Sequence, residues 1–187
     1  MKCTVSQAST YLNTLKSLGS VGNIPMCHWA DRNLAIVERA VRPVMKAFND
    51  SDEARALNRM YAQVQQESSM LYNGELASIK KQKLSEEQEK KALEKAAKER
   101  DDFVQNTVDE DIEKAFEAKR LEFEKTEIEF EPYKIKMSRI TDIDPDSLPE
   151  SLARLAVPKD TPKKAAAALL QARYAWLMAE LDCVIED

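Results

Sequence analysis

Residues 126–137 have the sequence Thr-Glu-Ile-Glu-Phe-Glu-Pro-Tyr-Lys-Ile-Lys-Met, which has a period of two in a chain otherwise patterned for helices. Apolar and charged side chains alternate, and the parity changes at Pro132. Alternation is typical of a strand with one buried face, and the proline restricts it to an edge position or divides it into two short strands. Residues 2–5 are the other strand candidate. We therefore expect the N-terminus to pair with 126–137 in a minor element of two or three strands.

Outside this element the patterns predict helices, so the expected fold class is mainly α, a helical bundle with a minor β element. Ser6 is the expected N-cap of a first helix that ends near Gly19. The second helix has the clearest apolar stripe, at steps of three and four residues. Its members are Leu34, Val37, Val41, Val44 and Phe48.

The middle of the chain contains several capping signals. Capping-box spacing predicts further helix starts at Asp50 with Glu53, Ser85 with Gln88, and Thr107 with Glu110. Asn73-Gly74 is a turn signal that predicts a boundary after the third helix. These signals divide the middle of the chain into three predicted helices.

The helix expected over 80–100 consists almost wholly of Lys, Glu, Gln and Ala. Pairs of glutamate and lysine four residues apart each contribute about 0.2–0.5 kcal/mol to such a helix. Because this pairing stabilises a helix without a core, we expect 76–106 to form a charged helical arm that protrudes into solvent or contacts a partner. We treat 1–187 as a single domain that includes this arm.

The last part of the chain contains a Pro-rich stretch over 144–162. We expect a short helix near 148–156 within it and an apolar helix after it. Thr161 as N-cap and Pro162 as the first helical residue define its start, and we expect it to reach about Val184. The segment 160–185 is apolar around nearly its whole circumference, which indicates burial on several sides.

Two interpretations of this C-terminal helix remain open. It is either a central core helix or a helix with one face against another subunit, since tryptophan is enriched at interface hot spots. The candidate interaction residues are Tyr174, Trp176, Leu177 and Leu181. On the second interpretation the protein forms a homo-oligomer through this helix.

The composition excludes several function classes. The 187 residues include three glycines, too few and wrongly placed for a P-loop or a dinucleotide-binding loop. Hydrophobic residues make up 43%, aromatic residues 6% and charged residues 33%, which favours a helix-rich, well solvated protein. The net charge of −5 opposes general attraction to nucleic acid over the whole surface, but it does not exclude local basic patches.

The cysteines predict an intracellular setting. Cys3, Cys27 and Cys183 are odd in number and far apart, which fits reduced thiols better than a disulfide framework. No apolar signal core follows Met1, and the most apolar stretch, 165–179, is too short to span a bilayer. We expect a protein without a membrane segment.

Candidate metal and catalytic groups are weak. Asp142, Asp144 and Asp146 resemble the opening of a calcium loop, but the positions that need glycine and a bidentate glutamate are Ser147 and Ala153. A turn that caps the next helix is the favoured interpretation.

The cysteines and the single histidine, His28, lack the spacing of a zinc site or a supported nucleophile and base pair. No cofactor, metal or catalytic residue is expected, and the protein is interpreted as a non-enzyme.

One face of the second helix is basic. It carries Arg32, Arg39, Arg42 and Lys46, opposite the apolar stripe. Either it docks an acidic partner or a nucleic-acid backbone, or it is an ordinary solvated face, which Asp31 and Glu38 beside it favour.

The order of these segments resembles small helical proteins of unknown function from tailed bacteriophages. The resemblance covers residues 3–140 in outline: a Lys-x-Thr-Val-Ser-Gln-Ala start, a helical pair, a charged long helix and the segment 127–137, which is its specific part. No site residues are known in those proteins. The resemblance implies a phage protein located in the host cytoplasm or the virion.

The resulting functional prediction is a non-enzymatic phage protein that acts through protein–protein contacts with phage or host proteins, as a virion structural or assembly component. The alternatives are a phage-encoded inhibitor of a host defence or housekeeping protein, and a nucleic-acid-binding accessory protein.

Overall fold

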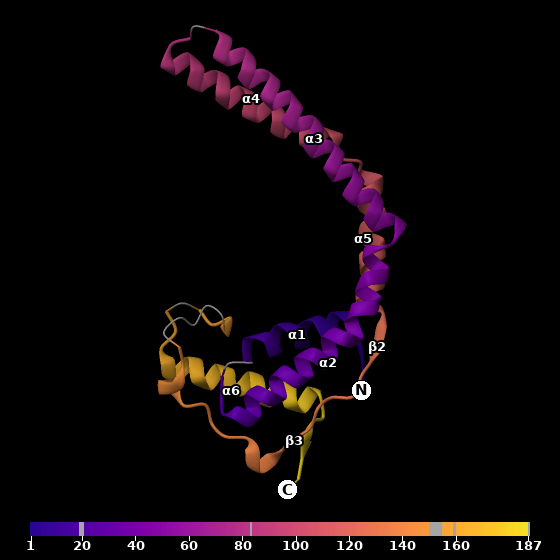
Figure 1. Ribbon diagram of the computed structural model, residues 1–187, viewed down its shortest axis with the longest axis vertical. Helices are drawn as coiled ribbons and strands as arrows, with labels where there is room; N and C mark the ends of the chain where they lie inside the picture. The colour runs from indigo at the N-terminus through magenta and orange to yellow at the C-terminus, as the bar shows by residue number, and fades with distance from the viewer. Residues whose placement is uncertain (19–20, 83, 150–154, 159, 187) are drawn as a thin grey trace. The chain divides into compact units, whose positions relative to one another are not determined.

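The computed structural model (Figure 1) describes the chain except for residues 19–20, 83, 150–154, 159 and 187. The mainly α fold class with a minor β element is confirmed. The chain forms two compact units, unit 1 with Met1–Lys46 and Glu122–Asp187, and unit 2 with Ala47–Leu121. Two helices, α2 (Ile24–Asn49) and α5 (Glu110–Lys125), contain the points where the chain passes between the units.

The expected pairing of the N-terminus with the late strand is confirmed. Strand β1 (Lys2–Thr4) pairs antiparallel with β2 (Glu127–Glu129), with Cys3 opposite Ile128. Cys3 and Ile128 are buried while the glutamates of β2 are exposed, as the alternation predicts. The Met1 amino group continues the ladder by donating to the Phe130 carbonyl at 2.7 Å.

A second strand pair differs from the prediction. Residues 184–185 were expected in the last helix, but α6 (Lys163–Glu180) ends earlier and Val184–Ile185 forms β4. Strand β4 pairs parallel with β3 (Ile135–Lys136). The chain leaves the helix through Asp182 at φ 45°, a left-handed conformation that ends an α-helix. Pro132 lies between β2 and β3, so the proline divides the segment into two short strands.

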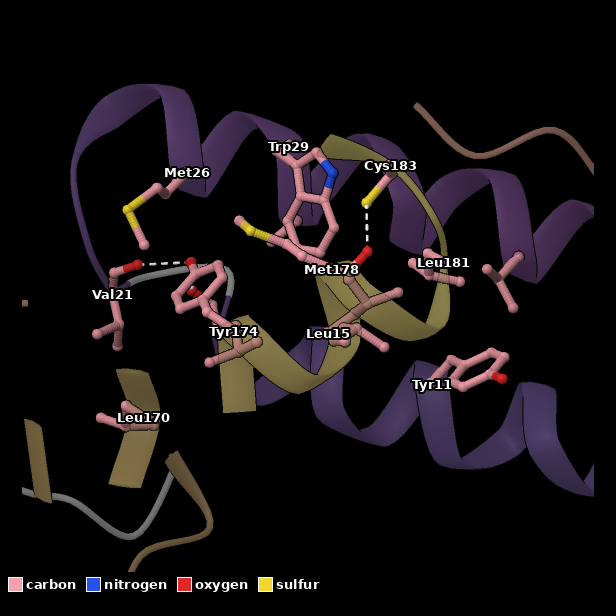
Figure 2. Packing of buried hydrophobic residues seen from close by; sticks show 14 of the residues in the cluster. Tyr11, Leu15, Val21, Met26, Trp29, Leu170, Tyr174, Met178, Leu181 and Cys183 are labelled. Carbon is pink, nitrogen blue, oxygen red and sulfur yellow. Dashed lines mark hydrogen bonds between the residues drawn. The ribbon is translucent and has the colours of Figure 1, made fainter. Parts of the chain in front are cut away.

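The core of unit 1 is formed by α1 (Val5–Leu18), the first half of α2, and α6 (Figure 2). Trp29 and Tyr174 are fully buried, with ring centroids 6.0 Å apart. The Tyr174 hydroxyl lies 2.8 Å from the Leu18 carbonyl and 2.6 Å from the Val21 carbonyl. Tyr174 therefore joins α6 to the end of α1 by a polar contact inside an apolar core.

Unit 2 is built on α3 (Asp52–Lys81) and α4 (Glu86–Thr107), which lie side by side in Figure 1. The short connection between them makes the pair antiparallel, and we call it the hairpin. The end of α2 and the start of α5 belong to the same unit, where the Phe48 and Phe116 rings lie 5.4 Å apart.

The Ser85–Gln88 capping box is confirmed, with the side chain of each residue bonded to the backbone of the other. The cap assignments to Ser6, Asp50 and Thr107 are wrong by one or two residues. Helix α1 begins at Val5, and the Thr4 Oγ1 accepts from the Gln7 amide at 3.2 Å in place of Ser6. Ser51 caps α3, accepting from the Ala54 amide at 3.2 Å, and Asp109 accepts from the first amides of α5. Each competing residue carries a side-chain oxygen as suitable for capping as the predicted one.

Two other boundaries also differ. Helix α3 continues through Asn73-Gly74, because a glycine in a helix costs only about 1 kcal/mol relative to alanine. At the start of α6 the cap is Pro162 and not Thr161, with no side-chain cap bond. The helix expected near 148–156 falls largely on residues outside the described part, and the 3₁₀ turn η2 (Pro145–Ser147) precedes it.

Candidate functional site

Unit 1 contains a pocket of about 330 Å³ whose lining is rich in cationic side chains. We call it the basic pocket. It is lined by Pro25, His28, Tyr133, Lys134, Ile135, Lys136 and Arg139. Residues from the first turns of α2 thus meet a segment more than 100 positions later in the sequence.

Asn33 ties this late segment to α2. Its side chain is fully buried, donates to the Tyr133 carbonyl at 3.0 Å and accepts from the Tyr133 amide at 2.8 Å. It also donates to the Trp29 carbonyl one turn earlier, at 3.1 Å. A buried amide with its groups satisfied in this way fixes the path of the chain past Tyr133.

Strand β3 determines the side to which Lys134 and Lys136 point. The Ile135 side chain is buried and its amide donates to the Cys183 carbonyl at 2.8 Å. Because side chains alternate along a strand, Lys134 and Lys136 share the opposite, exposed side. Beyond the strand, the Asn23 side chain donates to the Arg139 carbonyl at 2.9 Å. One end of the segment is therefore attached to Asn33 within α2, and the other to Asn23 just before the helix.

The cations of the basic pocket are not neutralised within the described part of the chain. Lys134, Lys136 and Arg139 make no ion pair there, and the lining contains no carboxylate. An unpaired cluster of like charges costs free energy through mutual repulsion, which an anion would relieve.

All four residues of the predicted basic face, Arg32, Arg39, Arg42 and Lys46, are exposed on α2. His28 lies one turn before Arg32 on the same side of the helix. The sequence did not predict one site composed of His28, Tyr133, Lys134, Lys136 and Arg139. The lysine pair at 134 and 136 was a signal, but the partner segment was not visible in the sequence.

The residues proposed for contact through α6 do not form one surface. Tyr174, Leu177 and Leu181 are in the core of unit 1, while Trp176 is 41% exposed. The Trp176 ring lies 6.0 Å from the Tyr11 ring. The helix therefore serves as a core element, and Trp176 is the one residue of this set that is available for contact.

A second pocket of about 390 Å³ lies where α6 meets β4. Its lining is mainly apolar and includes Met137, Ile140, Met178 and Cys183. Burial raises the pKa of the Cys183 thiol to about 11, and the Cys183 Sγ donates to the Met178 carbonyl at 3.5 Å (Figure 2). A protonated thiol is a poor nucleophile, so this pocket offers no activated cysteine at neutral pH.

The remaining thiols are similar. Burial also raises the pKa values of Cys3 and Cys27, and all three cysteines are free. In the part of the chain that the structure describes, no three His, Cys, Asp or Glu side chains form a group that could hold a metal ion. Asp144 instead caps η2, accepting from the Asp146 amide at 3.0 Å.

Among the described helices, none has the length and apolar character needed to cross a bilayer. Comparison with protein-family models, with curated proteins and with solved structures found no match.

Proposed function

We propose that this chain is a non-enzymatic protein of a tailed bacteriophage that acts through protein–protein contacts, as a virion structural or assembly component. The observation that carries the proposal is the hairpin of unit 2, which is long but has almost no core of its own. The phage setting rests on the resemblance of the segment 127–137 and the order of elements around it.

The described residues of Ala47–Leu121 include only four buried ones. They are Ala54, Val64, Ser68 and Ala96, of which three are small. Helices in proteins are stabilised chiefly by packing an apolar face, and exposed ion pairs such as Lys91 with Glu87 add little. The hairpin therefore has much to gain from burying further surface against another protein.

The hairpin also exposes large apolar side chains. Met70 is 60% exposed and Leu71 is 51% exposed, and both lie in the second half of α3. Methionine and leucine adapt to a partner's shape, and methionine is common at surfaces that bind several partners. This part of α3 is the contact that we assign to a phage or host protein.

A polar hollow lies between α3 and α4, on another side of α3 from Met70 and Leu71. Gln65, Ser68 and Ser69 of α3 face Arg100, Asp101, Val104 and Gln105 of α4 around a space of about 490 Å³. Arg100 stacks over the Tyr72 ring at 5.3 Å and donates to Asp101 at 2.7 Å. Arginine is enriched among residues that dominate binding energy, and Arg100 lines this hollow, where a partner side chain would meet it.

The test is quantitative mass spectrometry of purified particles and assembly intermediates of the phage that encodes the chain. The wild-type chain should be present in one of them. The double variant Met70→Glu with Leu71→Glu should be incorporated at least tenfold less, because each glutamate places a charge in the contact. Circular dichroism should show unchanged helix content, since both positions are exposed.

The matched control is Asn58→Glu with Gln66→Glu, which adds the same charge to exposed polar positions of α3. This variant should be incorporated like the wild type. Absence of the wild-type chain from both particles and intermediates would reject the structural role and leave the inhibitor alternative. In that case the chain should copurify from infected cells with one host protein in equal amounts.

A further inference from the structure

We infer that unit 1 binds single-stranded nucleic acid across the basic pocket and the basic face, with backbone phosphates on the cations and a base against Tyr133 and His28. The inference is independent of the hairpin contact proposed above, because every residue that carries it belongs to unit 1.

The pocket and the face are continuous on α2. Each helical residue turns by about 100°, so positions 32, 39, 42 and 46 all lie within about 40° of His28. From His28 to Lys46 this line extends for about 27 Å at 1.5 Å per residue. Lys134, Lys136 and Arg139 join it at the pocket. A line of repeated cations matches a polymer of repeated anions better than it matches one small anion.

The two carboxylates of α2 itself lie beside the line. Asp31 and Glu38 lie on its flank, about 60° and 80° from His28 around the helix axis. Glu38 is already paired with Lys16 at 3.7 Å. The anionic ligand therefore meets cations along the line without a carboxylate of α2 directly on it.

The charge of unit 1 permits such a ligand. Of the chain's net charge of −5, the larger part belongs to unit 2, where 17 acidic residues outnumber 13 basic ones. Unit 1 is almost balanced, with 16 acidic and 15 basic residues. The whole-chain charge is thus a poor guide to the field at the basic face.

The donors are side chains and not the helix terminus. Asn23 caps α2 by accepting from the Met26 amide at 2.9 Å, and Pro25 has no amide hydrogen. The guanidinium of Arg139 would bind phosphate oxygens through two parallel N–H groups. The ammonium groups of Lys134 and Lys136 would bind them as point charges.

Two rings in the same pocket favour nucleic acid over an acidic polypeptide. The His28 and Tyr133 rings meet edge to face, with centroids 5.7 Å apart and an interplanar angle of 89°. Tyr133 is 43% exposed, so part of its ring is free to stack on a base. Cations beside exposed rings are the usual components of single-strand binding sites, whereas a chain of carboxylates has nothing to stack.

The experiment is fluorescence anisotropy with full-length protein and a labelled oligothymidine of about 20 nucleotides, from about 50 to 200 mM salt. The double variant Lys136→Ala with Arg139→Ala should weaken binding at least tenfold at the lower salt. It should also reduce the slope of log affinity against log salt by about 1.4, since each lost single-strand phosphate contact accounts for about 0.7.

The matched control is Lys125→Ala with Lys164→Ala, which removes two exposed cations of unit 1 outside the pocket. It should change affinity less than twofold. Tyr133→Ala should weaken binding at least fivefold with the salt slope unchanged, because stacking releases no counterions. Asn33 bonds the backbone of Tyr133, so this substitution leaves the attachment to α2 in place.

Two competitors distinguish the sources of the anion. Unlabelled oligonucleotide should displace the probe at least tenfold better than poly-glutamate or inorganic phosphate at equal charge. Equal competition by poly-glutamate would assign the surface to an acidic protein, and equal competition by phosphate would assign it to a free phosphate. Either result, an absence of binding at about 50 mM salt, or an equal effect of the control variant would overturn the inference.

Discussion

Asn33 organises the basic pocket without lining it. Its amide exchanges two hydrogen bonds with the backbone of Tyr133, a residue 100 positions away, and a third bond joins it to Trp29. An asparagine in the middle of a helix is normally a weak choice, because its side chain competes with the backbone for hydrogen bonds. Here that capacity links α2 to the segment that carries the pocket's lysines.

Replacement of this residue should be costly. Asn33→Ala leaves the Tyr133 amide and carbonyl without their partners, and we expect the free energy of unfolding to fall by about 2–3 kcal/mol. Urea denaturation followed by tryptophan fluorescence measures the change, since Trp29 is buried beside the site. The control Asn58→Ala, on the exposed side of α3, should change stability by less than about 0.5 kcal/mol. Equal effects of the two substitutions would contradict the role assigned to Asn33.

At the scale of elements, α3 shows how a helix can continue through a turn signal. Asn73-Gly74 has the composition of a turn, yet α3 extends to Lys81 and ends beside basic residues that favour a helix C-terminus. Thirty residues of mostly good helix formers outweigh the local preference of two.

The same element offers a stabilising substitution. A Cβ atom at Gly74 would have no heavy atom within 4 Å, so Gly74→Ala should raise the free energy of unfolding of the hairpin by about 0.5–1 kcal/mol. Circular dichroism at 222 nm during urea denaturation measures it. Gly22→Ala is the contrast: Gly22 has φ 101° and its added Cβ would lie 3.3 Å from the Met26 Cβ, so this substitution should destabilise unit 1. A loss of stability in Gly74→Ala would show that the helix is interrupted there.

At the scale of the whole molecule, the two units differ in how they are stabilised. Unit 1 buries Trp29, Tyr174 and a set of leucines, whereas α4 in unit 2 buries only Ala96. Full burial of a large apolar side chain contributes about 1.5–3 kcal/mol, so most burial-derived stability belongs to unit 1.

Hydrogen exchange should show this difference. We expect the amides of α4 to exchange at least tenfold faster than those in the middle of α6, because the local opening free energy follows burial. Exchange measured by mass spectrometry on the free protein tests it, and a partner bound to the hairpin should slow α4 while leaving α6 unchanged. Equal protection of α4 and α6 in the free protein would contradict the view that the hairpin lacks a core.

The sequence by itself determined the mainly helical class and the Ser85–Gln88 cap, because periodicity and caps depend on near neighbours along the chain. It also predicted the long-range pairing of β1 with β2, because an alternating strand needs a partner and residues 2–5 were the other strand candidate. The tertiary structure alone decided three further features. It paired residues 184–185 with β3 in parallel, and it buried Tyr174, Leu177 and Leu181. It also brought His28 beside Tyr133, Lys134 and Lys136. These features depend on contacts between distant segments, such as that of Asn33 with Tyr133, which leave no periodic trace in either segment.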